Sequence, residues 1–181
     1  MTWRAPDQDQ PFRDQLVELL PRMRRFALSL TGDMTEADDL VQAACERALA
    51  RRHQWRSGSR LDSWIFSIIH HLLIDEHRSM RKQRQHLPLT EERLPSTTAN
   101  NMRKLEARWR LGQVKAAMQQ LSDRERVIIS LVCIDGMSYQ DAASTLQIPL
   151  GTVMSRLARA RKRLHQLVTA RQTPAAEHNG C

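Results

Sequence analysis

The sequence predicts an all-α protein of two small helical domains joined by a flexible linker, the second being a four-helix domain with a helix-turn-helix. Apolar residues recur at steps of three and four along most of the chain, which is the spacing of one helix face. Residues 86–102 lack this period and contain two prolines and clustered Ser, Thr and Asn. Aromatic residues make up only 4% of the chain, which suits small helical cores.

These patterns divide the chain into five parts. We expect disordered ends at residues 1–10 and 171–181, because both are polar. The first domain is expected at 11–85, the linker at 86–102 and the second domain at 103–170. A chain of 181 residues can hold two small domains of this kind.

Three helices are predicted in the first domain. The first starts at Phe12 and ends at Gly32-Asp33. Thr35 with Asp38 is expected to cap the second, and the third begins near Asp62. The residues expected to form the core are Leu16, Leu19, Leu20, Met23, Ala27, Leu30, Ala37, Leu40, Val41, Ala44, Ala48, Trp64, Ile65, Ile68, Ile69, Leu72 and Leu73. For Trp64 a core role is favoured over stacking on bases, and Trp55 is compatible with either.

Four helices are predicted in the second domain, the first at 105–121. Ser122 and Glu125 have capping-box spacing, and Gly136 is the expected stop of the helix that they open. Ser138 with Asp141 opens a short helix that ends in the tight Gln147-Ile148 turn, and Pro149 suits the start of the last helix. The residues expected to face inward are Leu111, Val114, Met118, Leu121, Val127, Ile128, Leu131, Val132, Tyr139, Ala142, Ala143, Leu146, Val153, Leu157, Ala160, Leu164 and Leu167.

The last helix carries a polar and basic face opposite its apolar one. Its members are Thr152, Ser155, Arg156, Arg159, Lys162 and Arg163, and no acidic residue occurs from Ala142 to Ala176. A helix, a short turn and a second helix with such a face is the pattern of a DNA-binding helix-turn-helix. The small Ala142 and Ala143 permit close crossing of the two helices, which favours DNA binding over a merely solvated basic helix.

An acidic and polar cluster lies on the outer face of the second predicted helix. Its members are Glu36, Asp38, Asp39, Gln42 and Glu46. Phosphates would repel this cluster, so it is not expected to face DNA. It suits a protein partner with a basic surface, and a solvated face is the alternative.

Composition restricts the function classes. The net charge of +8 and the pI of about 10.4 favour a polyanionic partner. The N-terminus lacks the apolar run of a signal peptide, and Trp64–Ile74 is too short to span a bilayer. Cys45, Cys133 and Cys181 are widely separated and lack metal-ligand spacing, which indicates a reduced, cytoplasmic compartment. No nucleophile–base set, phosphate-binding loop or metal cluster is visible, so neither catalysis nor a cofactor is expected.

Two sets of motifs resemble one protein family. The runs FALSLTGDMTEADDLVQAACERAL and RLDSWIFSIIHHLLIDEHR resemble the second conserved region of bacterial sigma factors of the extracytoplasmic-function class. The run LSDRERVIISLVCIDGMSYQDAASTLQIPLGTVMSRLARARKRL resembles the fourth region of the same family. Both sets occur in the family's order and at about its spacing, and they cover most of residues 12–168.

The resemblance implies a promoter-specificity subunit of bacterial RNA polymerase. Docking on the polymerase clamp helices would involve Asp38, Asp39, Leu40 and Gln42. Capture of an extruded −10 base would involve the loop at 56–62, with Arg56, Ser57 and Arg60, while Arg78 and Arg81 would hold the −10 backbone. The −35 element would be contacted by Thr152, Ser155, Arg156, Arg159 and Arg163. Further implied partners are the polymerase flap and an anti-sigma protein, and SLTGD…ADDLVQ hints at general-stress relatives.

Three positions depart from the family's pattern. His70-His71 stand where Arg-Asn is frequent, and Ala44-Cys45 are smaller than usual. Gln147 stands where Gly is common, and a left-handed backbone would be strained for Gln.

Two alternatives to a sigma factor are retained. A free-standing helix-turn-helix regulator would need neither the helix of Asp38 and Asp39 nor that of Trp64. A sigma-like interaction module would bind only a regulatory protein, even in the presence of core polymerase.

Overall fold

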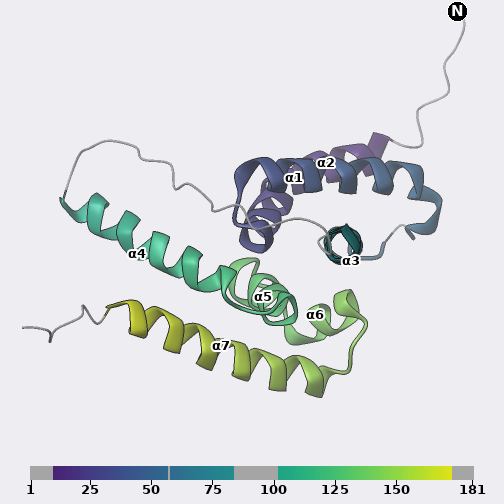
Figure 1. Ribbon diagram of the computed structural model, residues 1–181. Helices are drawn as coiled ribbons and strands as arrows, with labels where there is room; N and C mark the ends of the chain where they lie inside the picture. The colour runs from purple at the N-terminus through teal and green to yellow at the C-terminus, as the bar shows by residue number, and fades with distance from the viewer. Residues whose placement is uncertain (1–9, 57, 84–101, 173–181) are drawn as a thin grey trace, which may run out of the picture.

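The computed structural model describes residues 10–56, 58–83 and 102–172, with side chains described except at 80–83, 102–108, 171 and 172 (Figure 1). Over these residues the regular secondary structure is entirely helical, which confirms the all-α class. The tails and the linker that the sequence predicts lie almost wholly outside the described residues, so their structure stays a prediction.

The first domain contains α1 (Gln10–Thr31), α2 (Met34–Ala50), the short 3-10 turn η1 (Arg52–Gln54) and α3 (Leu61–Gln83). Its core holds most of the predicted apolar residues. Three aromatic residues complete it and are at most 1% exposed: Phe12, Phe26 and Phe66.

The start of α2 differs from the prediction at its cap. Gly32 has a φ of +82°, as suits the glycine that ends α1. The N-cap is Asp33, whose carboxylate accepts the amides of Thr35 at 2.8 Å and Glu36 at 3.1 Å. The predicted cap at Thr35 is therefore wrong, because Asp33 already satisfies the free amides of the first turn. These bonds also hold the pKa of Asp33 below its ordinary value.

The second domain contains α4 (Met102–Gln119), α5 (Asp123–Ile129), the π-helical turn η3 (Ser130–Ile134), α6 (Tyr139–Leu146) and α7 (Leu150–Gln172). The predicted capping box is present, with the Ser122 amide donating to the Glu125 carboxylate at 3.0 Å. Gly136 has the positive φ of +78° expected after a helix stop. The π-helical turn was not predicted, because it has the same apolar spacing as an α-helix at this length.

Three residues predicted to face inward in the second domain are exposed instead. Leu111 is 69% exposed and Val114 is 39% exposed on α4, and Tyr139 is 37% exposed at the start of α6. Met118 and Leu121 are buried as expected, at 5% and 3%. Among the described side chains of α4, the buried ones lie at its C-terminal end, so the predicted apolar stripe extends beyond the surface that buries it.

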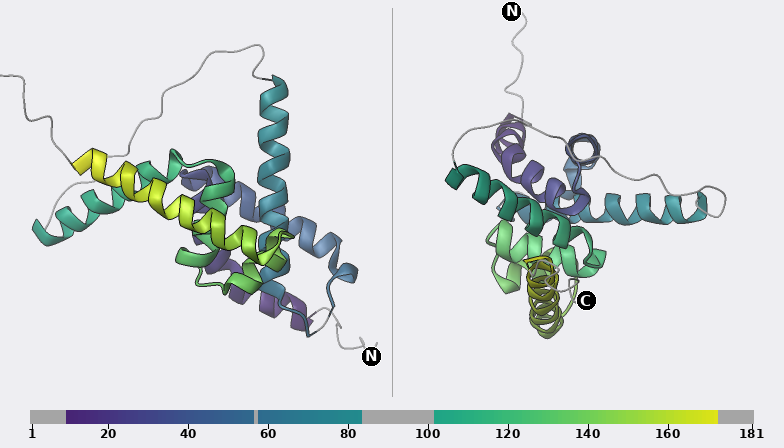
Figure 2. Two further views of the ribbon diagram at one scale, coloured as in Figure 1. Left: turned by 90° about the horizontal axis from the view of Figure 1, so that it is seen from below. Right: turned by 60° about the vertical axis from the view of Figure 1, so that its left-hand side comes forward.

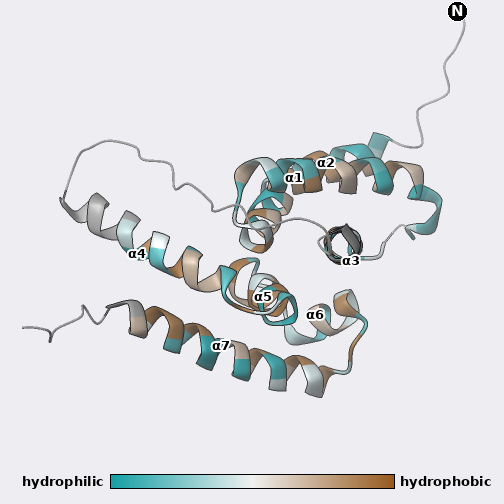
Figure 3. Ribbon diagram, viewed as in Figure 1, coloured by the Kyte–Doolittle hydropathy of each residue, from teal (hydrophilic) through white to brown (hydrophobic). Residues whose placement is uncertain are grey.

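The two domains pack directly against each other (Figure 1). Helices α1 and α3 of the first domain contact α4, α5, η3 and α6 of the second. A side chain on Gly32 would collide with Gln119 of α4, which shows how closely the domains approach. The C-terminal half of α3 projects from this body (Figure 2), and α7 shows alternating hydrophobic and hydrophilic bands along its length (Figure 3).

Candidate nucleic-acid and polymerase interface

Helices α6 and α7 form the predicted helix-turn-helix. The N-cap of α6 is Ser138, whose hydroxyl accepts the Asp141 amide at 3.1 Å. Gln147 closes α6 in the left-handed conformation, with φ 53° and ψ 44°, as the strained turn position predicts. The Ile148 amide then returns to the Ala143 carbonyl at 3.1 Å, and Pro149 begins the turn into α7. The turn is thus held by backbone bonds, which fixes the direction in which α7 leaves α6.

The polar face of α7 is accessible along its first half. Ser155, Arg159 and Arg163 are exposed, and Thr152 and Arg156 are half-buried. The opposite face is anchored by core residues that are at most 2% exposed: Val153, Leu157 and Ala160. A helix held from one side with hydroxyl and guanidinium groups on the other can enter a major groove, where Arg binds guanine and Ser or Thr binds either bases or phosphates.

A cleft of about 280 Å³ adjoins this face, between the start of α5 and α7. It is lined by Ser122, Arg124, Glu125, Arg156 and Arg159. The Glu125 carboxylate is occupied by the Ser122 amide and hydroxyl, the latter at 2.7 Å. The cleft thus contains three guanidinium groups and one carboxylate that is already hydrogen-bonded. This arrangement favours binding of an anion such as a phosphate in the cleft. Sequence analysis did not assign Arg124 to this surface.

The residues predicted for −10 DNA lie on a loop and on one helix. Arg56 and Arg60 are exposed on the loop before α3, where Gly58 has a φ of +87°. Ser57 lies outside the described residues. Arg78 is exposed on the projecting half of α3, and Arg81 belongs to the same helix, but its side chain is outside the described part.

The two tryptophans near this loop pack into the first domain. The Phe12 ring lies 5.4 Å from the Trp55 ring and 6.3 Å from the Trp64 ring, measured between centroids. The core role favoured for Trp64 is therefore confirmed.

The residues predicted for polymerase binding divide into exposed and buried positions. Asp38, Asp39 and Gln42 are exposed on α2, and Gln42 donates to Glu46 at 3.1 Å. Asp38 accepts a bond from Arg24 of α1 at 3.1 Å. Leu40 is only 5% exposed, so it supports the helix from inside and does not present its side chain to a partner.

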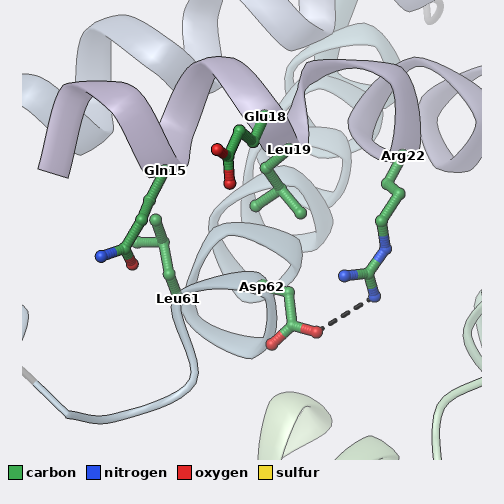
Figure 4. Close-up of a pocket in the computed structure, with 6 residues that line it drawn as sticks. All are labelled: Gln15, Glu18, Leu19, Arg22, Leu61 and Asp62. Atoms are coloured by element: carbon green, nitrogen blue, oxygen red, sulfur yellow. Dashed lines mark hydrogen bonds and ion pairs between the residues drawn. The ribbon is translucent and has the colours of Figure 1, made fainter. Parts of the chain in front are cut away.

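An ion-pair chain joins the two domains, in the order Asp135, Arg22, Asp62, Arg60 and Asp141. Arg22 of α1 donates twice to Asp135, at 3.0 and 2.6 Å, and once to Asp62 at the start of α3, at 3.0 Å. Arg60 donates twice to Asp62, at 3.1 and 2.8 Å, and also pairs with Asp141 of α6. Figure 4 shows Arg22 reaching down from α1 to Asp62 beside a cleft of about 300 Å³ that Gln15, Glu18, Leu19 and Leu61 also line.

The ion-pair chain shifts the pKa of Arg22, Arg60 and Asp62. The bonds to Asp135 and Asp62 raise the pKa of Arg22, and those to Asp62 and Asp141 raise the pKa of Arg60. Burial acts to raise the pKa of Asp62, but hydrogen bonds from Arg60, the Ser63 amide and Arg22 bring it below its ordinary value. Arg22, Arg60 and Asp62 are therefore charged at neutral pH.

Comparison with known proteins identifies the family. Residues 16–70 match the Sigma2 domain of PhyR, and residues 111–164 match sigma-70, region 4. The extracytoplasmic-function RNA polymerase sigma factor EcfG of Rhodopseudomonas palustris is 33% identical over 156 residues, which are 86% of this chain and 84% of the relative. The chain belongs to the extracytoplasmic-function sigma factors.

Further similarities extend over most of this sigma factor. SigE of Mycolicibacterium smegmatis, of the same class, is 29% identical over 170 residues, covering 92% of this chain and 65% of SigE. The sigma factor RpoE of Bartonella quintana, solved in complex with the anti-sigma factor NepR, superimposes with a TM-score of 0.73. It is 30% identical, and the match covers 88% of this chain and 98% of RpoE.

The two family matches divide the candidate residues of this sigma factor. The first includes the acidic face of α2 and the loop before α3, but it ends before Arg78 and Arg81. The second includes the whole predicted −35 set on α7. In the described part of the chain no helix is long and apolar enough to cross a bilayer.

Sequence analysis missed the residues that hold the two domains together. Arg22 and Asp135 are separated by 113 positions, and no periodic pattern connects them. Arg126 is 9% exposed and donates to the carbonyls of Leu30, Met118, Gln119 and Leu121. In the sequence, the only sign of this role is that Arg126 stands next to the apolar residues Val127 and Ile128. An arginine in such a place is expected to be buried only if its hydrogen-bond partners are known.

Proposed function

We propose that this sigma factor binds core RNA polymerase and directs transcription from promoters with paired −35 and −10 elements. One observation carries the proposal. A single chain presents an exposed basic helix-turn-helix face on one domain and an exposed acidic helix on the other. DNA attracts the first and repels the second, so the two surfaces fit two different partners.

The proposal assigns each surface one role. The first domain, at 11–85, binds the polymerase clamp through Asp38, Asp39 and Gln42, with Leu40 supporting the helix from inside. Contacts to −10 DNA come from Arg56, Ser57, Arg60, Arg78 and Arg81. The second domain, at 103–170, meets the polymerase flap and reads −35 DNA through Thr152, Ser155, Arg156, Arg159 and Arg163, and residues 86–102 link the two.

Regulation by an anti-sigma factor belongs to the same proposal. The similar RpoE was solved bound to the anti-sigma factor NepR, which supports a protein of that kind as partner here. Sigma factors are in general specificity subunits and not enzymes, and we infer that this chain likewise leaves catalysis to the polymerase. We place its action in the cytoplasm, where polymerase and promoter meet.

Reconstituted transcription tests the proposal. Purified core polymerase is incubated with a fragmented genomic library, with and without the protein, and start sites are mapped. We expect new, discrete start sites that share two upstream motifs. Binding to duplex DNA without new start sites would instead support the free-standing regulator.

Charge reversal on α2 tests the polymerase surface. Asp39→Arg places a cation in the exposed acidic face, so we expect binding to core polymerase to weaken at least about tenfold. Asp14→Arg is the matched control, because Asp14 is exposed on α1 outside that face. Both variants should retain duplex DNA binding through α7. Equal co-purification of Asp39→Arg and the wild type with core polymerase would contradict the assignment.

The match of residues 16–70 to the Sigma2 domain of PhyR supports one second candidate. PhyR of Bartonella quintana is described as an anti-anti-sigma factor, and its complex with NepR resembles this chain in fold. A sigma mimic of that kind would bind an anti-sigma factor but would produce no new start sites with core polymerase. The transcription experiment therefore separates the two functions.

A further inference from the structure

Two apolar side chains are exposed at the start of α7, the second helix of the helix-turn-helix. Leu150 is 40% exposed and Met154 is 52% exposed. They stand four positions apart, so they are neighbours on the helix surface. Neither belongs to the hydrophobic core, which α7 enters through Val153 and Leu157. Packing within the protein therefore does not account for these two side chains.

Met154 lies on the face of α7 that points away from the core. The exposed residues of this face over the first turns are spaced as one side of a helix: Gly151, Met154, Ser155 and Ala158. Gly151 has no side chain, Ala158 carries one methyl group and Ser155 one hydroxyl. Met154 therefore has the longest side chain of the four and extends furthest from the helix.

The polar side chains beside Met154 are directed elsewhere. The Ser155 hydroxyl donates to the Thr152 carbonyl at 3.2 Å, and the Arg159 guanidinium donates to the Ser155 carbonyl at 3.3 Å. Arg159 also lines the cleft beside α5, together with Arg124. Guanidinium groups at the side of a helix suit the phosphates at the edge of a groove. The centre of the face is left to Met154.

Gly151 allows the start of α7 to approach a partner closely. A side chain at this position would meet no other atom within 4 Å, so packing within the protein does not require glycine here. Glycine also weakens a helix relative to alanine. Its recognised use is to let the backbone come close to a ligand. The open space over Gly151 therefore fits the edge of a bound duplex.

The chemistry of the thioether limits what Met154 can recognise. Its sulfur donates no hydrogen bond and accepts only weakly. In the major groove the base edges present donors, acceptors and one apolar group, the C5 methyl of thymine. Contact with that methyl removes apolar surface of both groups from water, whereas contact with a donor or acceptor would leave it unpaired. Thymine is therefore the base that Met154 favours.

We propose that Met154 reads a thymine methyl group in the major groove of the −35 element, with Leu150 extending the apolar contact along the helix. The proposal rests on the function proposed above, because that function places α7 on −35 DNA. It adds a specificity-determining residue to the −35 surface. It also predicts that the −35 element contains a thymine at the base pair that faces the start of α7.

Replacing thymine with uracil tests the proposal, because uracil lacks only the methyl group. A promoter mapped in the transcription experiment is synthesised as a fluorescein-labelled duplex, and each thymine of its −35 element, on either strand, is exchanged in turn. The full-length protein in complex with core polymerase is titrated against each duplex. Fluorescence anisotropy then gives the affinity for each.

We expect the loss of one such methyl group to weaken binding of the wild type about fourfold, the factor that burial of one methylene-sized group gives. Met154→Ala should bind the thymine and uracil duplexes equally, and both as weakly as the wild type binds the uracil duplex. Met34→Ala is the matched control, because Met34 is 59% exposed on the first domain. It should keep the difference that the wild type shows.

Met154→Gln separates the apolar contact from the length of the side chain. Glutamine is about as long as methionine, but it would bury its amide unpaired against the methyl group. We expect this variant to lose the preference for thymine over uracil, with an unchanged urea midpoint because residue 154 is exposed. Retention of the full preference by Met154→Gln would overturn the proposal.

Gly151→Ala tests the close approach of the helix. The added methyl group should leave the urea midpoint at least as high as that of the wild type, because alanine favours a helix. It should weaken binding to the thymine and uracil duplexes alike, because it occupies the space between the helix and the groove. A loss of affinity without a loss of stability cannot result from unfolding. Unchanged affinity would contradict the close approach on which the proposal depends.

Loss of methyl recognition and loss of promoter binding have different meanings. If no exchange of thymine for uracil weakens the wild type, or if Met154→Ala is weakened as much as the wild type, the proposal for Met154 is overturned and the proposed function stands. If no form binds the promoter, the wild type included, the proposed function is contradicted together with the role of Met154.

Discussion

Arg126 provides the sharpest test of how the two domains are held. Its guanidinium is almost fully buried and donates to four carbonyls. Met118 and Gln119 lie at the end of α4, Leu121 follows two residues after it, and Leu30 lies in the last turn of α1. Carbonyls at a helix end have no partner within the helix, so one side chain satisfies the ends of helices from both domains.

The expected cost of Arg126→Ala follows from these four acceptors. A buried acceptor left without its donor costs about 1–3 kcal/mol. The Met118 carbonyl keeps a donor, because it also accepts the Leu121 amide at 3.1 Å. Taking the lower limit for each of the other three carbonyls gives about 3 kcal/mol, since water enters the space left by the side chain and satisfies part of the loss. Burial lowers the pKa of Arg126, so burying the cation itself carries a cost that the variant no longer bears. We therefore expect the free energy of unfolding to fall by about 2–3 kcal/mol.

Urea denaturation, followed by far-UV circular dichroism and by tryptophan fluorescence, measures this change. Arg124→Ala is the control, because Arg124 is exposed two positions earlier and should alter stability by at most about 0.5 kcal/mol. Arg126→Lys should recover little, since one ammonium group cannot reach four carbonyls as a planar guanidinium does. A loss below about 1 kcal/mol for Arg126→Ala would refute the reasoning.

Three further predictions concern single residues. Gln147→Gly should raise the free energy of unfolding by about 0.5–1 kcal/mol, because glycine adopts the left-handed turn conformation without strain; a lowered urea midpoint would contradict this. Arg156→Ala should weaken binding to the cognate −35 duplex by about 1–3 kcal/mol, or about 5- to 150-fold, in a fluorescence anisotropy titration, and unchanged affinity would remove it from the −35 surface. Burial and the neighbouring His71 lower the pKa of His70 to about 4. The unfolded chain therefore binds a proton below about pH 6.5 that the folded protein does not, and stability falls as the pH drops from there towards 4. His70→Gln should flatten that decline in urea midpoints measured across this range, and an unchanged slope would show that His70 does not cause it.

The helices and their caps could be predicted from the sequence because their signals are local. The capping box at Ser122, the N-cap at Ser138 and the stop at Gly136 involve residues within a few positions of each other. The apolar faces of α1, α2 and α3 followed from their period alone. Prediction failed where a stripe had no neighbour to cover it, as at Leu111 and Val114, and where two acceptors competed for one helix start, as at Asp33.

The candidate surfaces could also be predicted from the sequence where their signal is local. The polar face of α7 and the acidic face of α2 were predictable, because each lies on one helix opposite an apolar stripe. Leu40, which the family motif places in the polymerase-binding set, is buried, as its place in the apolar period of the helix predicted.

The sequence by itself determined that this protein is helical, that it has two domains and that it belongs to the sigma factors, since period, caps and motifs are properties of neighbouring residues. Only the tertiary structure decided that the domains pack together and that Arg60 meets Asp141. It likewise paired Arg22 with Asp135 and gave Arg126 its four acceptors. These contacts join residues far apart in the chain, and a charged residue has many possible partners until folding brings one within a few ångströms.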